Sequence, residues 1–188
     1  MRAIDLTIGF PGKPVLSHLD FAWPEKGAVA VMAPSGGGKT TLLRTVAGLL
    51  PPLAGKIEGT AGKKIAFLFQ EDRLLPWLSA RKNVELAGGA AAAQEWLRAM
   101  EIEDMDVLPS QMSGGMRRRV ALARALSFGG DILILDEPFK GLDLALRERI
   151  AGRIRGGAPF ILMAVHDPEE ARLMGAEIAA LQGREDAK

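Results

Sequence analysis

Ala28-Val-Ala-Val-Met-Ala-Pro-Ser-Gly-Gly-Gly-Lys-Thr-Thr41 is predicted to form an apolar strand that runs directly into a glycine-rich loop, and residues 42–50 continue it as a helix. Glycines allow main-chain N–H groups to turn toward an anion. The helix that follows directs the positive end of its dipole at the same point. The stretch therefore predicts an α/β fold with a phosphate-binding site at the end of a strand.

The loop also supplies side chains suited to a nucleotide. We expect Lys39 to place its charge near the β and γ phosphates and Thr40 to offer a hydroxyl to Mg²⁺. Ala33 stands where the usual pattern has its first glycine, and a left-handed backbone there would cost about 1 kcal/mol, so we predict that Ala33 does not adopt it. Gly-Lys-Thr alone is a weak signal, and the alternative is an ordinary strand-to-helix turn. The predicted phosphate ligands are Pro34, Ser35, Gly36, Gly37, Gly38, Lys39, Thr40 and Thr41.

Short apolar segments alternate with helical patterns along the rest of the chain. Four predicted strands are almost wholly apolar, as in a parallel sheet that is buried on both faces. We therefore expect an α/β fold with a mostly parallel core sheet and short antiparallel N-terminal strands. The predicted strands are 3–8, 19–23, 28–33, 65–69, 132–136, 160–165 and 177–181, and helices are predicted to start after Gly38, Leu78, Ser113, Leu142 and Asp167. The Ala/Gly-rich run 87–93 is either a weak helix or a flexible connector.

Composition narrows the class of protein. A chain of 188 residues fits one domain, and 48% apolar residues can build a large core. The net charge of +1 lacks the broad basic footprint of a nucleic-acid-binding protein. There is no cysteine, and no apolar run approaches the roughly 20 residues of a membrane span. Asp5 interrupts any signal-peptide core. We therefore expect a cytoplasmic protein whose membrane role, if any, needs a separate partner.

Two predicted strands end in chemically active residues. Asp136 ends one strand and is suited to Mg²⁺, and Glu137 is suited to orienting and partly deprotonating an attacking water. The alternative, that these acids merely stop the strand, is weakened by the loop upstream. His166 follows the strand 160–165, at the edge where ligands bind in α/β sheets, so we predict that it senses the γ-phosphate. His18 has no such context and receives no role.

Met112-Ser-Gly-Gly-Met116, followed by Arg117-Arg-Arg119 and a helical run, is the most informative stretch for the family. Together with the loop, Gln70, Asp136-Glu137, Asp143 and His166, in this order, it resembles the ATP-binding-cassette (ABC) nucleotide-binding domains over nearly the whole chain. The fold implied is an α/β P-loop NTPase spanning 1–188, with a helical subdomain at about 72–111 plus a helix at 113–128. The segment 69–77 is similar to that of nitrate, sulfonate, taurine and thiamine-type importers.

The resemblance implies a function and further roles. The chain would be an ATP-hydrolysing importer subunit, peripheral on the inner face of the cell membrane, that uses ATP and Mg²⁺ and works with an integral-membrane permease and a separate substrate-binding protein. It would act as a head-to-tail homodimer that encloses two ATP molecules. Gln70 would reach Mg²⁺ and the attacking water, and Phe10 would stack on adenine, unless it is a core residue. Ser113, Gly114 and Gly115 would bind the γ-phosphate held by a second copy, and Asp143 would lie at the dimer interface.

Some residues depart from the family pattern. Met112 replaces Leu, Lys140-Gly141 replaces Ser-Ala, and Arg118 takes a frequent Gln position. None of these removes a group that the mechanism needs. We interpret 117–119 as a solvated helix face with one arginine near phosphate, not as a nucleic-acid site. We also expect no regulatory C-terminal domain. The alternatives are a soluble cassette ATPase acting on protein or nucleic-acid machinery, and a nucleotide-binding module without hydrolysis.

Overall fold

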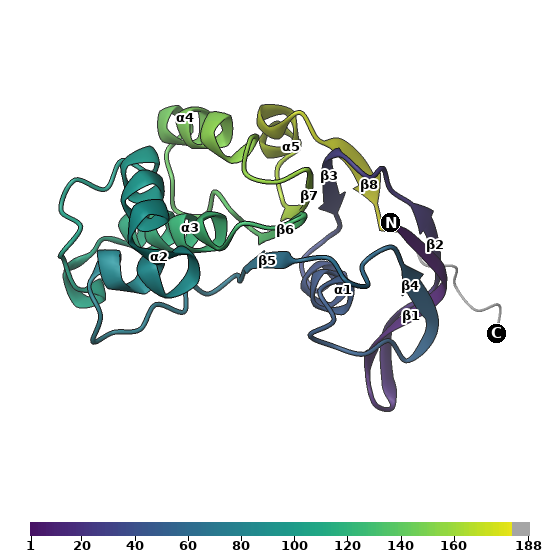
Figure 1. The fold of residues 1–188 in the computed structure, drawn as a ribbon. Helices are drawn as coiled ribbons and strands as arrows, with labels where there is room; N and C mark the ends of the chain where they lie inside the picture. The colour runs from purple at the N-terminus through teal and green to yellow at the C-terminus, as the bar shows by residue number, and fades with distance from the viewer. Residues whose placement is uncertain (182–188) are drawn as a thin grey trace.

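The computed structural model describes residues 1–181 and contains two sheets (Figure 1). The larger sheet has five parallel strands in the order β5-β6-β7-β3-β8, which are Ile65–Leu68, Ile132–Asp136, Phe160–Val165, Gly27–Met32 and Glu177–Ala180. The smaller sheet is antiparallel in the order β2-β1-β4, which are Lys13–Ala22, Arg2–Phe10 and Ala54–Glu58. The predicted α/β fold with a mostly parallel core is confirmed.

The central strands are buried on both faces, as their continuous apolar sequence predicted. Every residue of β6 and β7 is buried. Alternate residues of a strand point to opposite faces, so Ile132 and Ile134 join one hydrophobic cluster, and Leu133 and Leu135 join the other. The sheet is therefore covered on both sides, and its strand ends are the places where polar groups meet.

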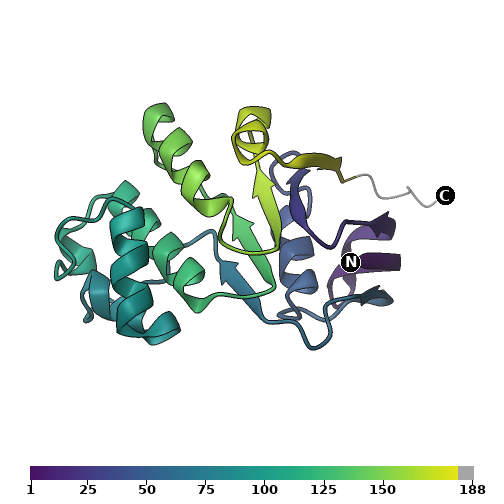
Figure 2. The same ribbon diagram turned by 45° about the horizontal axis from the view of Figure 1, so that its top comes forward.

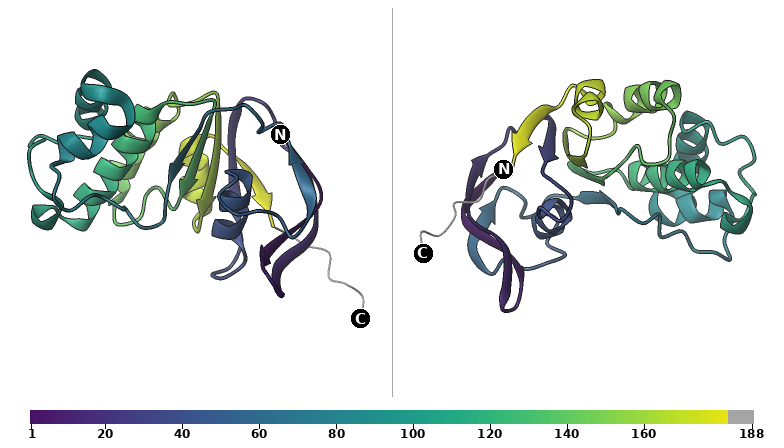
Figure 3. Two further views of the ribbon diagram at one scale, coloured as in Figure 1. Left: turned by 60° about the horizontal axis from the view of Figure 1, so that its bottom comes forward. Right: turned by 180° about the vertical axis from the view of Figure 1, so that it is seen from behind.

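Helix α1 (Lys39–Val46) lies between the two sheets (Figures 2 and 3). Leu42, Leu43 and Val46 pack with Leu6 of β1 in the cluster on that face. The predicted helix over 42–50 was too long at its C-terminal end. The helix stops at Val46, and Gly48 adopts a left-handed φ of 72°, which ends the helical path before the prolines at 51 and 52.

The opposite face of the sheet is covered by a helical part at one end of the molecule (Figure 2). It comprises α2 (Ala80–Ala99), a 3-10 helix (Pro109–Gln111) and α3 (Gly114–Phe128). Of the two expectations for run 87–93, the structure shows the helix, which continues through the run and is kinked at Gly89, where φ is 79° and ψ is 175°. The neighbouring Gly88 lets α2 approach α3 closely, since a Cβ there would lie 2.0 Å from the Ser127 carbonyl oxygen.

Helices α4 (Leu144–Ile154) and α5 (Pro168–Met174) follow β6 and β7 and pack on the same face as α3. Asp143 and Asp167 cap them by accepting hydrogen bonds from Leu146 N and Glu169 N at 2.9 Å each. All five predicted helix starts lie at or close to the observed ones. Within residues 1–181, no helix has the length and apolar composition needed to cross a bilayer. Residues 182–188 of the predicted domain lie outside the described range.

Candidate nucleotide-binding site

The glycine-rich loop between β3 and α1 has the conformation that a phosphate cradle needs. Gly36 and Gly38 adopt left-handed φ values of 78° and 86°. Gly37 is required for a different reason, because a Cβ there would lie 2.9 Å from the Ala33 Cβ and 3.0 Å from the Pro34 carbonyl oxygen. Among residues 1–181, the non-glycine residues with a positive φ do not include Ala33. The prediction that Ala33 avoids the left-handed region is therefore confirmed.

Lys39 lies inside this loop and is only 7% exposed. Its Nζ donates to the carbonyl oxygens of Ala33 at 2.6 Å and Pro34 at 3.3 Å. No carboxylate of residues 1–181 forms an ion pair with it, although buried charges are normally paired. A buried lysine that has carbonyl acceptors but no carboxylate partner, beside turned glycines, is the environment that a phosphate would complete, so the residues present fit a nucleotide phosphate.

The carboxylate that ends β6 meets the first turn of α1. Asp136 is 1% exposed, and Thr40 Oγ1 donates to its Oδ2 at 2.8 Å. Burial raises the pKa of Asp136, although the bond from Thr40 opposes the rise. Within the described residues there is no group of three or more His, Cys, Asp or Glu that could hold a metal ion by itself. Mg²⁺ in nucleotide sites uses one or two carboxylates with phosphates and waters, and Thr40 with Asp136 fits that pattern.

The Glu137 side chain, after β6, contacts residues that follow two other strands. Its Oε1 lies 2.6 Å from His166 Nε2, after β7, and accepts a hydrogen bond at 3.2 Å from Gln70 Nε2, after β5. Lys140 Nζ lies 3.8 Å from its Oε2. Burial alone would raise the pKa of Glu137, but hydrogen bonding and charge from His166, with Lys140 and Gln70, lower it below the usual value. The side chain is therefore a carboxylate at neutral pH, as a base requires.

These groups line one pocket of about 220 Å³, which has room for several groups the size of a water molecule at about 30 Å³ each. Its lining consists of residues 35–41, Gln70, Glu137 and His166. The structure therefore brings together most of the predicted loop ligands with all three predicted catalytic side chains. Asp136 does not line the pocket itself, but it accepts a hydrogen bond from Thr40, which does.

Other predicted residues lie outside this pocket. Phe10 sits at the β1–β2 turn and is 49% exposed, which rules out its alternative role as a core residue. Ser113 caps α3 by accepting a hydrogen bond from Met116 N at 3.2 Å. A Cβ on Gly115 would lie 3.2 Å from the Gly141 carbonyl oxygen, so the Ser-Gly-Gly turn (residues 113–115) packs on the loop that precedes Asp143. None of these residues lines the pocket of their own chain.

The interpretation of residues 117–119 as a solvated face was wrong for Arg118, whereas Arg117 and Arg119 are half-buried. Arg118 is 2% exposed, and its guanidinium contacts the main chain around Gln70 and Glu137. Arg117 donates to the Met112 carbonyl at 2.7 Å, and Arg119 donates to the Met100 carbonyl at 2.8 Å. The sequence did contain a signal, because Arg118 shares the helical stripe of the buried residues Ala121, Leu122, Ala125 and Leu126.

Comparison with known proteins agrees with this geometry. A family model described as ABC transporter matches residues 16–140. The chain is 35% identical to the aliphatic sulfonates import ATP-binding protein SsuB 1 of Pseudomonas savastanoi pv. phaseolicola, over 93% of this chain and 77% of that protein. It is 36% identical to the taurine import ATP-binding protein TauB of Rhizobium johnstonii, over 90% and 72% of the two chains.

A solved structure has the same fold over almost its whole length. It is the dimeric, post-hydrolysis state of the ATP-binding cassette MJ0796 bound to ADP and Pi, with a TM-score of 0.84 and 29% identity over 96% of this chain and 94% of that one. The predicted P-loop NTPase fold and the predicted family are both confirmed. The chain belongs to the ABC transporter family of ATP-binding proteins.

Proposed function

We propose that this chain binds and hydrolyses MgATP and that hydrolysis powers import through separate integral-membrane permease subunits. One observation carries the proposal. The Glu137 carboxylate is held by Gln70 and His166 beside the glycine-rich loop, where the γ-phosphate of a nucleotide held by that loop would lie. A non-hydrolytic binding module has no need of a carboxylate so placed.

The residues of the pocket divide the chemistry among them. Main-chain N–H groups of the loop and Lys39 would hold the β and γ phosphates. Thr40 and Asp136 would hold Mg²⁺, which would supply positive charge that neutralises the phosphates. Glu137 would orient the attacking water and accept its proton. His166 would hold the carboxylate and contact the γ-phosphate, and Gln70 would align the water from the β5 side.

We further propose that two copies act head to tail and enclose two ATP molecules. The Ser-Gly-Gly turn lies at the start of α3 and does not line the pocket of its own chain, as expected if it completes the site of a second copy. Asp143 would lie at the same interface, and exposed Phe10 would stack on adenine. The relative MJ0796 was solved as a dimer. The helical part, 72–111 with 113–128, is proposed as a subdomain within one nucleotide-binding domain.

The permease would bind the chain on its helical side, and the chain would then lie on the cytoplasmic face of the cell membrane. Trp77 and Leu86 lie in or before α2 and are 71% and 65% exposed, so they offer apolar surface to a partner. The two relatives named above are import ATP-binding proteins. By analogy, a separate substrate-binding protein would deliver the substrate, and substrate specificity would reside in those other subunits.

Phosphate release by the purified chain tests the enzymatic part of the proposal. We expect Mg²⁺-dependent hydrolysis of ATP by the wild type, and co-purification with a permease from membranes of the source cell. Absence of hydrolysis both with and without the permease would contradict the proposal. Recovery with ribosomes or DNA in place of a permease would favour the alternative of a soluble cassette ATPase.

A further inference from the structure

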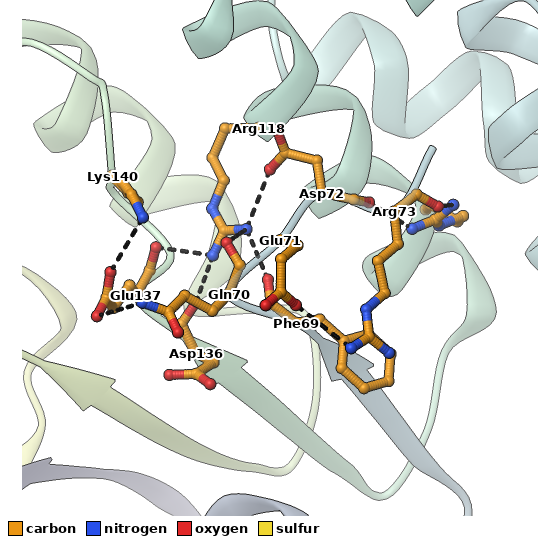
Figure 4. Close-up of polar contacts among 10 residues, drawn as sticks. Phe69, Gln70, Glu71, Asp72, Arg73, Arg118, Asp136, Glu137 and Lys140 are labelled. Atoms are coloured by element: carbon orange, nitrogen blue, oxygen red, sulfur yellow. Dashed lines mark hydrogen bonds and ion pairs between the residues drawn. The ribbon is translucent and has the colours of Figure 1, made fainter. Parts of the chain in front are cut away.

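Arg118 of α3 joins the ends of two neighbouring strands (Figure 4). Its Nη1 donates to the Phe69 carbonyl, after β5, at 2.7 Å and lies 3.4 Å from the Gln70 carbonyl. Its Nη2 donates to the carbonyls of Asp136 and Glu137, at the end of β6, the latter at 2.7 Å. One guanidinium therefore bonds the main chain of Glu137, which carries the catalytic carboxylate, and of the segment that contains Gln70, whose side chain donates to that carboxylate.

The environment of Arg118 is unusual for a charged side chain. It is 2% exposed, and its single ion pair within residues 1–181 joins Nη1 to Asp72 Oδ1 at 3.2 Å. Most of its hydrogen bonds go to neutral carbonyl groups, and its Nε has no hydrogen-bond partner in that part of the chain. An arginine remains protonated even when it is buried. A full positive charge therefore lies beside the ends of β5 and β6, where it binds main-chain oxygens.

The backbone that Arg118 holds at Glu137 is strained. Glu137 has a φ of 54°, a region that residues with a Cβ rarely occupy. The Glu137 main-chain N donates to the Ala164 carbonyl of β7 at 3.1 Å, and its carbonyl accepts from Arg118. The peptide groups on both sides of this residue are thus fixed, and its side chain is directed to Gln70 and His166.

We propose that Arg118 is a positioning residue of the ATPase reaction, which locks the main chain of Gln70 and Glu137 to the helix that carries the Ser-Gly-Gly turn. This inference rests on the proposed function, because it assumes that Glu137 and Gln70 act on the attacking water. Since Ser113 caps the same helix, a movement of the turn against a second nucleotide would be transmitted through Arg118 to the catalytic carboxylate.

Arginine suits this task better than the glutamine that the family often has at this position. A glutamine side chain carries one NH₂ group, whereas the guanidinium carries two NH₂ groups and an N–H in a rigid fork. The fork of Arg118 contacts four main-chain carbonyls at the ends of β5 and β6, more than the two N–H donors of one glutamine NH₂ can serve. Arg118→Gln therefore retains two donors but loses part of the bridge, and Arg118→Met removes every donor while keeping an unbranched apolar chain.

The test compares Arg118→Gln and Arg118→Met with the matched control Arg119→Gln in the full chain. Arg119 belongs to the same helix but donates to the carbonyls of Met100 and Glu101, away from the pocket. We expect kcat per folded protein to fall about tenfold or more in Arg118→Met and less in Arg118→Gln, since small displacements of a catalytic group cost that much. The Kd for ATP should change by less than about threefold, and the control should keep its kcat.

A second readout separates positioning from general loosening of α3. Each variant is combined with Glu137→Gln, and its dimerisation in MgATP is measured. In the Glu137→Gln chains, we expect both Arg118 variants to change the ATP concentration for half-dimerisation by less than about threefold. In chains that keep Glu137, we expect the same Arg118 variants to lower kcat. An unchanged kcat, or a loss of kcat matched by an equal loss of dimerisation, would overturn the inference. If Arg118→Met does not fold, Arg118→Gln alone decides.

The failure of this inference differs from the failure of the proposed function. If the proposed function is wrong, the wild type does not hydrolyse ATP and Glu137→Gln changes nothing. If only the role of Arg118 is wrong, the wild type hydrolyses ATP, Glu137→Gln abolishes hydrolysis, and both Arg118 variants keep the kcat of the control.

Discussion

His166 Nε2 lies 2.6 Å from Glu137 Oε1, although the two residues follow different strands of the parallel sheet. Gln70 bonds the same oxygen from a third strand end, so the orientation of the carboxylate is fixed from two sides before any ligand contacts it. An oriented base loses little entropy when the reaction begins, which is how positioning lowers a barrier.

His166→Ala should lower kcat by about 10²-fold, because general-base catalysis and its orientation contribute 10²–10⁴. The Kd for ATP should change little, since the loop and Lys39 carry binding. His18→Ala is the matched control, because His18 lies on β2 and bonds Asp5 at 2.6 Å, outside the pocket. Equal loss of activity in both variants, measured as phosphate release, would contradict a specific role for His166.

Thr40→Ala should raise the Mg²⁺ concentration needed for half-maximal hydrolysis, because the hydroxyl that bonds Asp136 at 2.8 Å would be lost. Hydroxyl and carboxylate oxygens are ligands that Mg²⁺ prefers, and loss of one of few protein ligands weakens binding by about tenfold. Thr45→Val is the control, since the Thr45 hydroxyl donates to the Thr41 carbonyl within the same helix. Titration of Mg²⁺ at saturating ATP distinguishes the two. An unchanged requirement in Thr40→Ala would argue against the proposed metal site.

Gly88→Ala should destabilise the fold by about 3 kcal/mol, the upper end of overpacking effects, because its Cβ would meet the Ser127 carbonyl oxygen at 2.0 Å. Gly152→Ala is the matched control in α4, where a Cβ meets only Arg155 Nη2, at 3.7 Å. It should stabilise by about 0.4–1 kcal/mol. Urea unfolding measures both, and a stable Gly88→Ala would show that α2 and α3 pack less closely than described.

Glu101 and Arg149 link the end of α2 to α4 through two bonds, Nε–Oε1 at 2.8 Å and Nη2–Oε2 at 3.1 Å. The hydrogen bonds from Arg149 lower the pKa of Glu101 despite the opposing effect of burial. A lowered pKa in the folded state means that the pair stabilises above the unfolded pKa of about 4.3 and that this stability is lost as pH falls through the folded value.

Arg149→Met should therefore lower Tm at pH 7 only slightly, because both side chains are partly exposed and solvent screens the pair. The difference from the wild type should shrink below about pH 4. A difference in Tm that stays constant from pH 7 to pH 3 would show that the packing of Arg149, not its charge, is responsible.

Much of the fold could be predicted because local signals agree with it. The predicted helix starts lie at or next to residues that cap the helices in the structure, such as Ser79, Ser113 and Asp143, and apolar runs marked the central strands. Strand β4 was missed because four of its five residues are exposed, so it lacks an apolar pattern. Its pairing with β1 is a main-chain property that composition does not record.

The candidate site also contains residues that could be predicted from the sequence and one that was not predicted. The loop, Glu137 and His166 were predictable because the carboxyl ends of parallel strands meet at one edge of the sheet, whereas Gln70 was predicted only from the family resemblance. The burial of Arg118 was not predicted although Arg118 lies on the buried stripe of α3, since arginine is almost never fully buried unless paired. Its partners are mainly carbonyl oxygens, which belong to every residue and leave no trace in the sequence.

In the proposed dimer, ATP joins two copies, and the Ser-Gly-Gly turn of each completes the site of the other. The most direct test is sedimentation of Glu137→Gln in MgATP, where hydrolysis cannot reopen the dimer. We expect a stable dimer, and we expect Ser113→Arg in the same background to bind ATP but remain monomeric. A Glu137→Gln chain that stays monomeric in MgATP, while the wild type hydrolyses ATP normally, would contradict the claim.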